Sequence, residues 1–455
     1  MPVLRMYFIY SLLLALGFLI LLPRFLFDAL NHGKYVAGFR ERLGLITPLE
    51  TTGRPVIWIH CVSVGETLAA RPLVRGIRQK FPEYSVAIST TTLTGQTIAR
   101  EVFKDDVARV FYFPFDWRWI VRRALSAINP TVVLMMETEL WPGFLRECQS
   151  RRIAVAVVNG RLSEKSFKRY RIISGFMSRV LGSISAAFMQ TEADGKRLVA
   201  LGMDPSRLFV TGNMKFDANS PSSSDERLTA EFRERFTVKK TSPLLVAAST
   251  HAPEEHILLG ALKRLSSDAE RKPRMLIAPR HPERFNEVAG LVKASGFRCA
   301  RRTANATEAD KLCEVILLDS IGELTAVYAL ASVVFVGGSI AETGGHNILE
   351  PAAVGAAVIT GANTFNFKEI VETFVEAEAV IQLPPLSGPD AAVELANTIR
   401  RLLTNPDEAA ELGTRAMNLV NQNRGATDRT LDGLRTLLGS FPKERSGENR
   451  PAIQN

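Results

Sequence analysis

The sequence has only four cysteines in 455 residues, and they lie far apart, at Cys61, Cys148, Cys299 and Cys313. They form no C-x-x-C pair, so we expect neither a disulfide framework nor a zinc knuckle. Unpaired cysteines favour a reducing compartment. The hydrophobic content of 46% and the charged content of 23% exclude a disordered or fibrous chain. A chain of this length is enough for two or three domains.

Nucleotide-binding signatures are also missing where glycines gather. The glycine-rich segment 334–351 matches neither the P-loop pattern G-x-x-x-x-G-K-[ST] nor G-x-G-x-x-G, and segment 160–166 lacks the second glycine of a P-loop. Kinase, NTPase and dehydrogenase functions are therefore disfavoured. No internal repeat is present.

Positive charge is distributed unevenly along the chain. Residues 1–212 carry 28 Lys and Arg against 16 Asp and Glu, whereas residues 213–455 carry 28 against 31. The densest cationic stretch, 151–179, has eight Lys and Arg and a single acid, Glu164. Such a stretch is either a solvated helix surface or a contact for nucleic acid, an anionic membrane or a phosphorylated substrate.

The start of the chain helps to choose among these partners. Residues 6–23 carry no charge, and as a helix they would span about 27 Å, close to the hydrocarbon thickness of a bilayer. The run predicts a membrane anchor rather than a cleaved signal peptide, because it ends without an A-x-A-like site. More Lys and Arg follow the run than precede it, which predicts that the rest of the chain faces the cytoplasm. Beside an anchor, the cationic stretch favours an anionic lipid or a lipid-borne phosphate over nucleic acid.

After the anchor, short β-branched runs alternate with segments of helical period, which is typical of parallel α/β architecture. In a first doubly wound domain we expect strands at 56–61, 85–89, 108–112, 131–136, 153–158 and 186–189. In a second we expect strands at 244–248, 274–278, 314–318, 333–336, 357–359 and, at the edge, 379–381. Segment 217–225 has the composition of a linker. The predicted division is an anchor at 1–30, domains at 31–216 and 217–440, and a polar tail at 441–455.

Candidate catalytic residues follow the strands of the first domain. Glu66 lies in the turn after strand 56–61, where a carboxylate is suited to act as a general base or simply complements a helix dipole. Glu137 and Glu139 leave the apolar strand 131–136 directly, either as functional acids or as partners of a cap or ion pair. Lys215 lies at the domain junction, and we expect it to point into a cleft.

In the second domain, two glycine pairs, 337–338 and 344–345, precede a helix expected near residues 346–347. Backbone N–H groups at that helix start would bind an anion, most naturally a phosphate, unless the segment is a plain structural turn. Glu350, one turn further, is placed to accept hydrogen bonds from two ribose hydroxyls.

A third group lies at the ends of other strands of the second domain. Arg280 is placed to neutralise a phosphate, and His281 can add a donor. His251 and His256 flank two acids, but their spacing is not H-E-x-x-H and Pro253 interrupts it, so we expect no metal site.

Taken together, these segments resemble the 3-deoxy-D-manno-octulosonic acid (Kdo) transferases of lipopolysaccharide synthesis. The blocks that carry the resemblance, between about residues 34 and 370, are S-V-G-E-T, E-T-E-L-W-P, V-N-G-R-L-S, G-N-M-K-F-D, A-S-T-H-A-P-E-E, P-R-H-P-E-R and G-G-H-N-I-L-E-P. The resemblance implies a GT-B glycosyltransferase with two Rossmann-like domains facing a cleft. It implies CMP-Kdo as the donor, bound by the C-terminal domain, and an anionic lipid A precursor (lipid IV-A) as the acceptor, bound by the N-terminal domain. With the predicted anchor, this places the enzyme at the inner membrane.

The same resemblance assigns roles to individual residues. Glu66 falls on the general base, and Glu137 and Lys215 fall on residues that stabilise the transition state. The CMP-binding positions are Pro279, Arg280, Ile321, Gly322, Glu323, Asn347, Ile348, Leu349 and Glu350. Because CMP carries one phosphate, a helix dipole and two cations could offset its charge, so we expect inverting transfer without metal or cofactor and without a nucleic-acid partner. The alternatives are another GT-B transferase or an epimerase acting on UDP-sugars, and a membrane-tethered scaffold without enzymatic activity.

Overall fold

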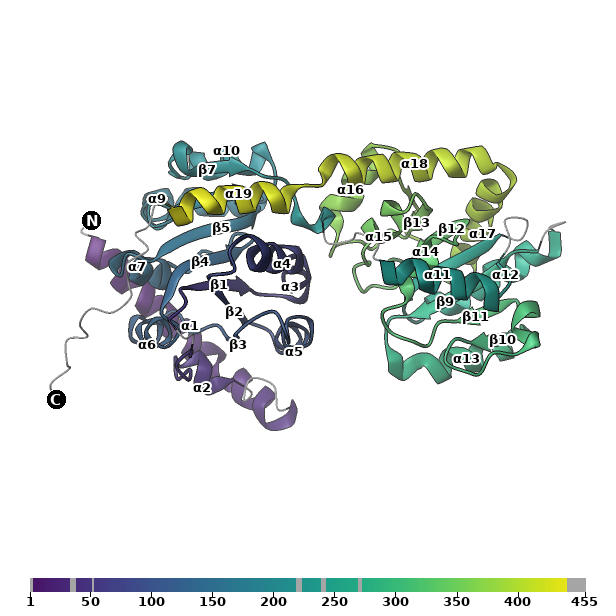
Figure 1. Ribbon diagram of the computed structural model, residues 1–455, viewed down its shortest axis with the longest axis horizontal. Helices are drawn as coiled ribbons and strands as arrows, with labels where there is room; N and C mark the ends of the chain where they lie inside the picture. The colour runs from purple at the N-terminus through teal and green to yellow at the C-terminus, as the bar shows by residue number, and fades with distance from the viewer. Residues whose placement is uncertain are drawn as a thin grey trace. The chain divides into compact units, whose positions relative to one another are not determined.

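The computed structural model describes residues 3–32, 38–50, 53–217, 223–238, 243–268 and 272–439. The chain divides into two compact units, unit 1 (Met1–Ala218 with Arg424–Asn455) and unit 2 (Asn219–Asn423). Each unit is built on a seven-stranded parallel sheet covered by helices (Figure 1). The predicted fold class, α/β with two Rossmann-like domains, is confirmed. The predicted polar tail, 441–455, lies outside the described residues.

The sheet of unit 1 has the strand order β3-β2-β1-β4-β5-β6-β7. Its strands are β1 (Val56–Cys61), β2 (Ser85–Thr90), β3 (Arg109–Tyr112), β4 (Pro130–Met136), β5 (Ala154–Gly160), β6 (Ala186–Met189) and β7 (Leu208–Val210). Its helices are α1 (Val3–His32), α2 (Phe39–Arg42), α3 (Val64–Ala69), α4 (Arg71–Lys80), α5 (Leu93–Val102), α6 (Arg118–Ile128), α7 (Pro142–Ser150), α8 (Glu164–Ile172), α9 (Ser174–Leu181), α10 (Glu192–Ala200), η1 (Pro205–Arg207), η2 (Met214–Phe216) and α19 (Ala426–Gly439). The strand order reverses between β1 and β4, and ligands of open α/β sheets bind at the carboxyl ends of strands at such a switch point.

Strand β1 is buried along its whole length, because helices cover both faces of the sheet. Trp58 points into one layer, where its ring contacts Phe111 and Phe144 at centroid distances of 5.1 and 5.2 Å. Ile57 and Ile59 point into the other layer. Two cores therefore hold β1 from opposite sides and fix the turn that follows it.

The sheet of unit 2 has the order β10-β11-β9-β8-β12-β13-β14, which reverses between β8 and β12. Its strands are β8 (Leu244–Thr250), β9 (Arg274–Pro279), β10 (Cys299–Arg301), β11 (Val315–Leu317), β12 (Val333–Val336), β13 (Ala357–Thr360) and β14 (Ile381–Gln382). Its helices are α11 (Ser223–Arg235), α12 (Glu254–Asp268), η3 (Pro282–Arg284), α13 (Phe285–Ala294), η4 (Glu308–Leu312), α14 (Leu324–Tyr328), α15 (Leu349–Ala353), α16 (Lys368–Glu376), α17 (Gly388–Thr404) and α18 (Pro406–Asn423).

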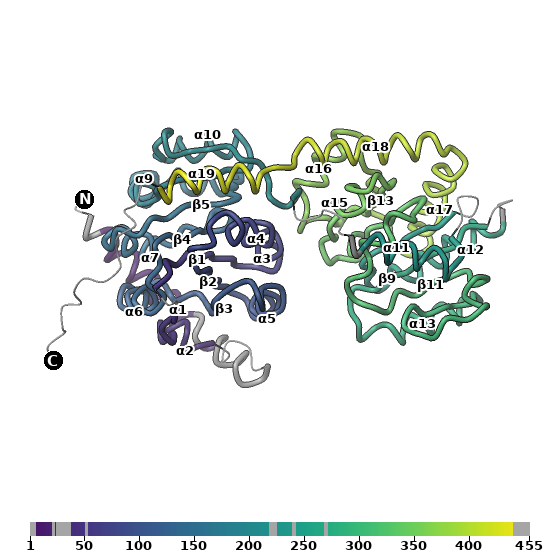
Figure 2. The backbone as a smooth tube through the Cα atoms, in the orientation of Figure 1, coloured from purple at the N-terminus to yellow at the C-terminus, as the bar shows by residue number. Residues whose placement is uncertain are grey.

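Unit 1 takes its last helix from the end of the chain, so the predicted second domain, 217–440, extends too far. Figure 2 shows α19 lying along the helices and strands of unit 1. Leu431 and Leu434 are buried in the same core as Ile57. The Asp217 carboxylate accepts hydrogen bonds from the N–H groups of Gly425 (2.7 Å) and Thr427 (2.6 Å), at the start of α19. Apolar burial and this capping contact together place α19 on unit 1.

Helix α1 packs on unit 1 through one of its sides. Tyr7 is buried and its ring meets Phe176 edge-on at 5.7 Å. The Tyr10 hydroxyl donates to Asp116 (2.8 Å), whose carboxylate also accepts the N–H of Gly143 at the start of α7. Among the residues that the structure describes, no helix is long and apolar enough to cross a membrane. The predicted membrane-crossing anchor at 1–30 is therefore not supported.

Candidate active site

Glu66 lies at the carboxyl end of β1, in the first turn of α3. Ser63 caps this helix, and the Glu66 carboxylate turns back to accept hydrogen bonds from the Val62 N–H (2.8 Å) and the Ser63 hydroxyl (2.8 Å). The side chain is buried, with 7% of the residue exposed. Burial, assisted by the charges of Glu137 and Glu139, raises the pKa of Glu66 to about 7, although its two hydrogen bonds oppose this shift. Glu66 is thus both a structural cap and a carboxyl group that exchanges protons near neutral pH.

Glu137 follows β4, the strand next to β1 at the switch point. Its backbone has a φ of 53°, a left-handed conformation that costs energy for a non-glycine residue and is common at functional sites. Its carboxylate pairs with the Lys215 ammonium (3.2 Å) and lies 3.7 Å from the Arg161 guanidinium. The structure therefore brings two of the predicted site residues, Glu137 and Lys215, into direct contact.

Asn159 and Arg161, to which the sequence assigned no role, support this ion pair. Asn159 is a buried residue of β5 with a φ of 54°, and its side-chain oxygen accepts the Met214 N–H (2.9 Å) at the start of η2. That contact fixes the turn that carries Lys215. The Asn159 side-chain nitrogen has no hydrogen-bond partner within the described part of the chain. The sequence signals for them were the V-N-G-R-L-S block and, for Arg161, its place in the cationic stretch 151–179.

Glu139 adds a third carboxylate to this end of unit 1. It accepts a hydrogen bond from the Trp141 indole N–H (3.1 Å). Burial raises the pKa of Glu139, and the nearby Glu137 charge adds to the shift. The charge of Glu137 thus adds to burial in raising the pKa of both Glu66 and Glu139, and such shifts let a carboxyl group act as a base near pH 7.

In unit 2, the glycine-rich loop after β12 already surrounds an anion. The Glu254 carboxylate, fully buried, accepts the N–H groups of Gly338 (2.8 Å), Ser339 (2.9 Å), Ile340 (2.9 Å) and Ala341 (3.2 Å). These groups are therefore not open to a phosphate. The helix expected near residues 346–347 begins at Leu349 and has only five residues, and its Leu349 N–H is taken up by the Asn347 side chain (3.0 Å). The Leu349 N–H is therefore not open to a phosphate, and the anion site expected at this helix start stays a prediction.

The predicted CMP-binding residues around this loop divide by exposure. Pro279, Ile348 and Leu349 are buried, so their backbones, rather than their side chains, are the parts that can meet a ligand. Arg280 is exposed beyond the end of β9. Glu350 is partly buried and accepts a hydrogen bond from the Asn347 amide (3.2 Å), and burial raises its pKa.

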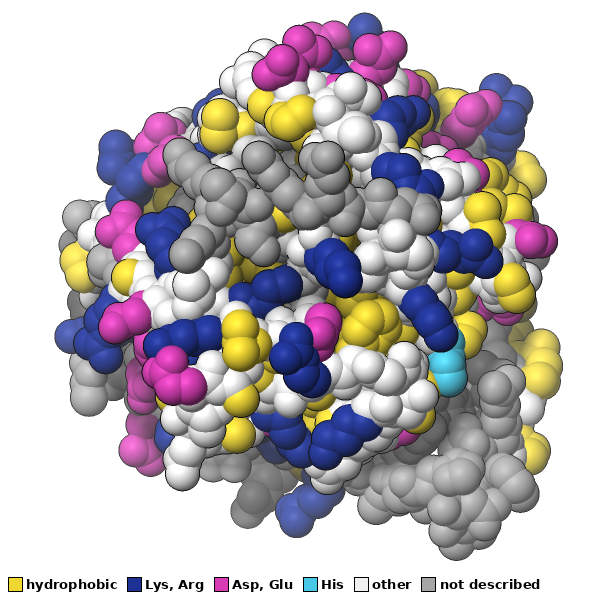
Figure 3. Space-filling view, turned by 90° about the vertical axis from the view of Figure 1, so that its right-hand side faces the viewer, with side chains coloured by type: hydrophobic (Ala, Val, Ile, Leu, Met, Phe, Trp, Pro, Cys, Tyr) yellow, Lys and Arg dark blue, Asp and Glu magenta, His cyan; other side chains and the backbone are white. Residues whose placement is uncertain are grey.

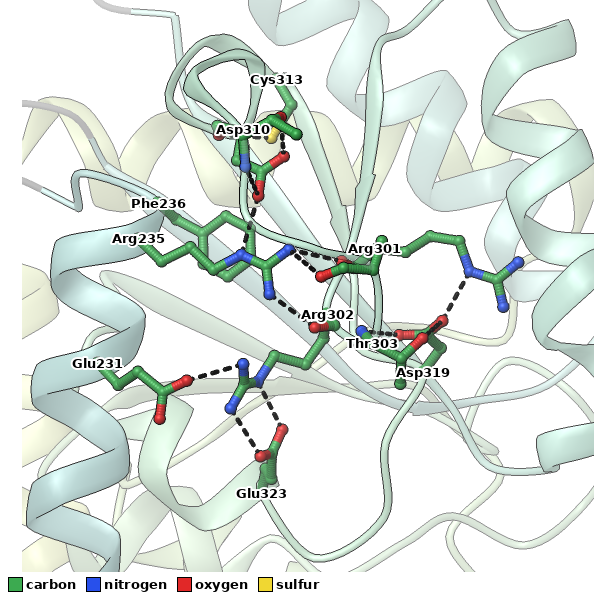
Figure 4. A network of polar contacts seen from close by, with 12 residues as sticks. Glu231, Arg235, Phe236, Arg301, Arg302, Thr303, Asp310, Cys313, Asp319 and Glu323 are labelled. Carbon is green, nitrogen blue, oxygen red and sulfur yellow. Dashed lines mark hydrogen bonds and ion pairs between the residues drawn. The ribbon is translucent and has the colours of Figure 1, made fainter.

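The remaining predicted CMP-binding residues are 321–323, and the last of them, Glu323, belongs to a polar network that Figure 4 shows from close by. The Glu323 carboxylate is bound twice by Arg302 (2.9 Å each) and also by the Ser320 hydroxyl (2.6 Å). Arg302 in turn contacts Glu231 of α11 (2.9 Å). Because these hydrogen bonds engage its carboxylate, Glu323 holds the loop in place. The tip of the loop is formed by Gly322, which has a φ of 87°, and by Ile321, which is 80% exposed.

Three histidines of unit 2, His251, His281 and His346, lie close together. The His251 and His346 Nε2 atoms lie 2.8 Å apart, and the His281 ring meets His251 edge-on at 5.0 Å. Among the described residues, no group of three or more His, Cys, Asp or Glu side chains is arranged to hold a metal ion. His256, which the sequence paired with His251, is exposed on α12.

Comparisons with known proteins identify the family of this chain. The family profile described as 3-deoxy-D-manno-octulosonic-acid transferase (kdotransferase) matches residues 37–218, and that of group 1 glycosyl transferases matches residues 230–419. The 3-deoxy-D-manno-octulosonic acid transferase of Haemophilus influenzae is 37% identical over 89% of this chain and 92% of that protein. The transferase of the same name from Bordetella pertussis is 32% identical over 84% and 87%. The crystal structure of UDP-GlcNAc 2-epimerase from Neisseria meningitidis shares the fold at 12% identity, with a TM-score of 0.55 over 84% of this chain and all of that one. The chain belongs to the family of 3-deoxy-D-manno-octulosonic acid transferases.

Proposed function

We propose that this enzyme transfers Kdo from CMP-Kdo to a lipid A precursor, lipid IV-A, with inversion at the anomeric carbon and without a metal ion. Family membership carries the reaction class. The observation that carries the mechanism is Glu66, a buried carboxyl at the switch point of unit 1 whose pKa is raised to about 7.

Glu66 acts as the general base. An acceptor alcohol does not ionise at neutral pH, so a positioned base must take its proton as the oxygen attacks. The new bond forms between the acceptor oxygen and the anomeric carbon of Kdo, while the bond from that carbon to the phosphate oxygen breaks and CMP leaves with the electron pair. Attack from the face opposite the leaving group inverts the configuration.

Glu137 and Lys215 stabilise the charges that develop during this displacement. Positive charge grows on the sugar ring as CMP departs, and a carboxylate held in place balances it without reorganisation. Negative charge grows on the phosphate, which suits the Lys215 ammonium. Their mutual ion pair supports this role, because it holds both groups in place before substrate binds.

The donor nucleotide binds unit 2. Arg280 meets the phosphate, Glu350 meets the ribose hydroxyls, and the backbone of the 321–323 loop meets the base. The exposed Arg280 guanidinium and the fixed loop of Figure 4 support this assignment. One phosphate leaves as a monoester, so one or two cations are enough to offset its charge.

The test is to incubate the purified protein with CMP-Kdo and lipid IV-A and to follow the lipid by mass spectrometry. The expected product is heavier by one or more Kdo units, and the same yield is expected with EDTA present. Turnover that requires added divalent metal would refute the metal-independent mechanism. Competition by UDP rather than CMP would favour the alternative, a UDP-sugar transferase or epimerase.

We also infer that unit 1 docks on the cytoplasmic face of the inner membrane, where an anionic lipid acceptor resides. The side of α1 that does not pack is apolar and exposed, as in helices that lie in a membrane interface. Its exposed side chains are Phe8, Ile9, Leu12, Leu13, Leu16, Leu19 and Ile20. Helix α8 adds exposed cations, with Ile172, 84% exposed, at its end; the cations are Lys165, Lys168, Arg169 and Arg171.

Not every cation of the 151–179 stretch belongs to this surface. Arg151 joins Arg118 and Arg122 around the buried Glu147 carboxylate and is therefore structural, and Lys168 pairs with Glu164 (2.7 Å). Cations also occur widely elsewhere: Figure 3 shows a face over which Lys and Arg side chains are spread. What favours α8 is therefore that it packs against α9, whose Phe176 contacts Tyr7 and Tyr10 of α1, and not its charge alone.

A further inference from the structure

His251 and His346 meet at the switch point of unit 2. His251 follows β8 and His346 lies in the loop after β12, and these neighbouring strands are the pair at which the strand order reverses. Their rings are nearly parallel, at 9°, with centroids 5.0 Å apart and Nε2 atoms 2.8 Å apart. Two side chains distant in sequence thus meet where open α/β sheets bind ligands.

Contacts with Glu254 and Gly338 hold the His251–His346 pair in place. The Glu254 carboxylate accepts a hydrogen bond from the backbone N–H of His251 (2.9 Å). The same carboxylate accepts the backbone N–H groups of the glycine-rich loop. His346 also packs against Gly338, where any Cβ would overlap its ring. The spacing between the two imidazoles is therefore a fixed feature of the fold.

The chemistry of a short imidazole contact limits what the pair can present. In the neutral pair, one Nε2 donates its proton to the other, so one outer Nδ1 is a donor and the other is an acceptor. One added proton converts the pair to an imidazole and an imidazolium, and both outer Nδ1 atoms become donors. In the described part of the chain, no hydrogen bond to either Nδ1 is formed. A charged pair with two donors suits an oxyanion, whereas a neutral pair does not.

Burial, together with neighbouring positive charge, disfavours the protonated form of both histidines in the free protein. Burial, then His251, Arg280 and His281, lower the pKa of His346 to about 4. Burial, then His281, Arg280 and Arg284, lower the pKa of His251, against an opposite effect of Glu255. The Glu255 carboxylate is largely neutralised by two contacts with Arg284 (2.7 and 3.2 Å). An incoming anion would offset these cations and reverse the preference.

We propose that His251 and His346 together bind an oxyanion of the sugar-nucleotide donor and take up one proton from solvent when it binds. The inference rests on the proposed donor, which carries two such groups, the phosphate of CMP and the carboxylate of Kdo. Arg280 is close enough to lower the pKa of both histidines, so it shares the anion with them.

Calorimetry of CMP binding to the full chain tests this. The binding enthalpy is measured at pH 7.5 in buffers of different ionisation enthalpy, and the slope gives the number of protons taken up. We expect close to one proton for the wild type, and CMP affinity that falls up to tenfold for each unit of rising pH over the range of uptake. His251→Gln and His346→Gln keep a polar atom near the Nε2 position but cannot hold the extra proton, so uptake should vanish. His256→Gln, an exposed histidine on the same helix as Glu254, is the matched control and should keep the uptake.

Two further ligands identify the anion. Cytidine has no phosphate and should bind without proton uptake. Uptake with CMP assigns the pair to the phosphate, whereas uptake only when Kdo is added to the CMP complex assigns it to the carboxylate. The inference would be overturned if the wild type bound CMP, and then Kdo, without taking up a proton. It would also be overturned by equal proton uptake in the wild type and in both Gln variants. Absence of CMP binding to the wild type would instead overturn the donor assignment itself.

Discussion

The role of Glu66 leads to a prediction about how activity depends on pH. A general base must be ionised, and burial raises the pKa of Glu66 to about 7, so activity should rise with pH through neutrality. At pH 6 only about a tenth of the enzyme would carry the ionised base, and kcat/KM should be about tenfold below its plateau at pH 8 to 9. The assay is the initial rate of Kdo transfer to lipid IV-A between pH 5.5 and 9.

Replacing the base tests the same argument directly. Glu66→Gln keeps the length of the side chain and can still accept the Val62 N–H, so α3 should keep its cap. It removes the basicity, and kcat at pH 8 should fall by about 10²- to 10⁴-fold while CMP affinity stays unchanged. The rise of activity with pH through about 7 should disappear with it.

A matched control separates the base from the cap. Ser63→Ala removes the hydroxyl that caps α3 and contacts Glu66 but leaves the carboxylate in place. It should cost about 0.5 to 2 kcal/mol of stability and far less activity than Glu66→Gln. Glu66→Gln should affect stability in the opposite direction to Ser63→Ala. A carboxyl group whose pKa is raised in the folded protein loses its stabilising contribution as pH rises through about 7, so Glu66→Gln should be at least as stable as the wild type at pH 8.

Three results would refute this account of Glu66. They are retention of more than about a tenth of the wild-type kcat by Glu66→Gln, a rate that is flat from pH 6 to 8, and a product with the anomeric configuration of the donor. A fall in activity of Ser63→Ala as large as that of Glu66→Gln would show that the cap, not the base, matters.

Three other substitutions test separate parts of the proposal. Arg280→Ala and Glu350→Ala should each weaken CMP binding about 10- to 150-fold by calorimetry, since each removes a charge-assisted hydrogen bond; wild-type affinity in both would place the nucleotide elsewhere. Reversing Lys165 and Arg169 to Glu together should raise the acceptor KM and weaken sedimentation with anionic vesicles, with CMP affinity unchanged; an unaltered acceptor KM at low salt would exclude α8 from docking. Leu431→Ala should lower the free energy of unfolding by about 2 to 5 kcal/mol in urea titration, because it opens a cavity under α19; a loss below about 0.5 kcal/mol would contradict the docking of this helix.

The central strands could be predicted from the sequence because each is a continuous apolar run buried on both faces. The expected bounds of β1 and β12 coincide with the observed ones. Strands β7 (Leu208–Val210) and β10 (Cys299–Arg301) were missed, because each is three residues long, lies at a sheet edge and is incompletely buried. So short a segment has no periodicity to read.

The course of α19 could not be predicted, since it depends on contacts between distant segments. Its amphipathic pattern fits a helix in either unit. Asp217 helps to assign it to unit 1, because its carboxylate accepts the N–H groups of Gly425 and Thr427. These residues lie more than 200 positions further along the chain. Likewise, Glu137 and Lys215 could be proposed separately, but their ion pair depends on Asn159, which holds the η2 turn across 55 positions.

The two switch points show why strand-end residues could be located from sequence while their chemistry could not. In unit 1, Glu66, Glu137 and Glu139 lie at the ends of β1 and β4, and burial together with the charges of Glu137 and Glu139 raises the pKa of Glu66, so this carboxyl group can exchange protons. In unit 2, the acid that follows the switch-point strand β8 is Glu254. Its carboxylate accepts backbone N–H groups and therefore serves to hold the loop. Because Glu254 takes up the N–H groups of residues 338–341, these four donors are not open to an anion, and the side chains of His251 and His346 are candidates to meet one. The place of a residue in its motif predicts the strand end at which it lies. Whether a carboxylate there acts as a base or holds the backbone depends on how many N–H groups donate to it, and those contacts come from the fold.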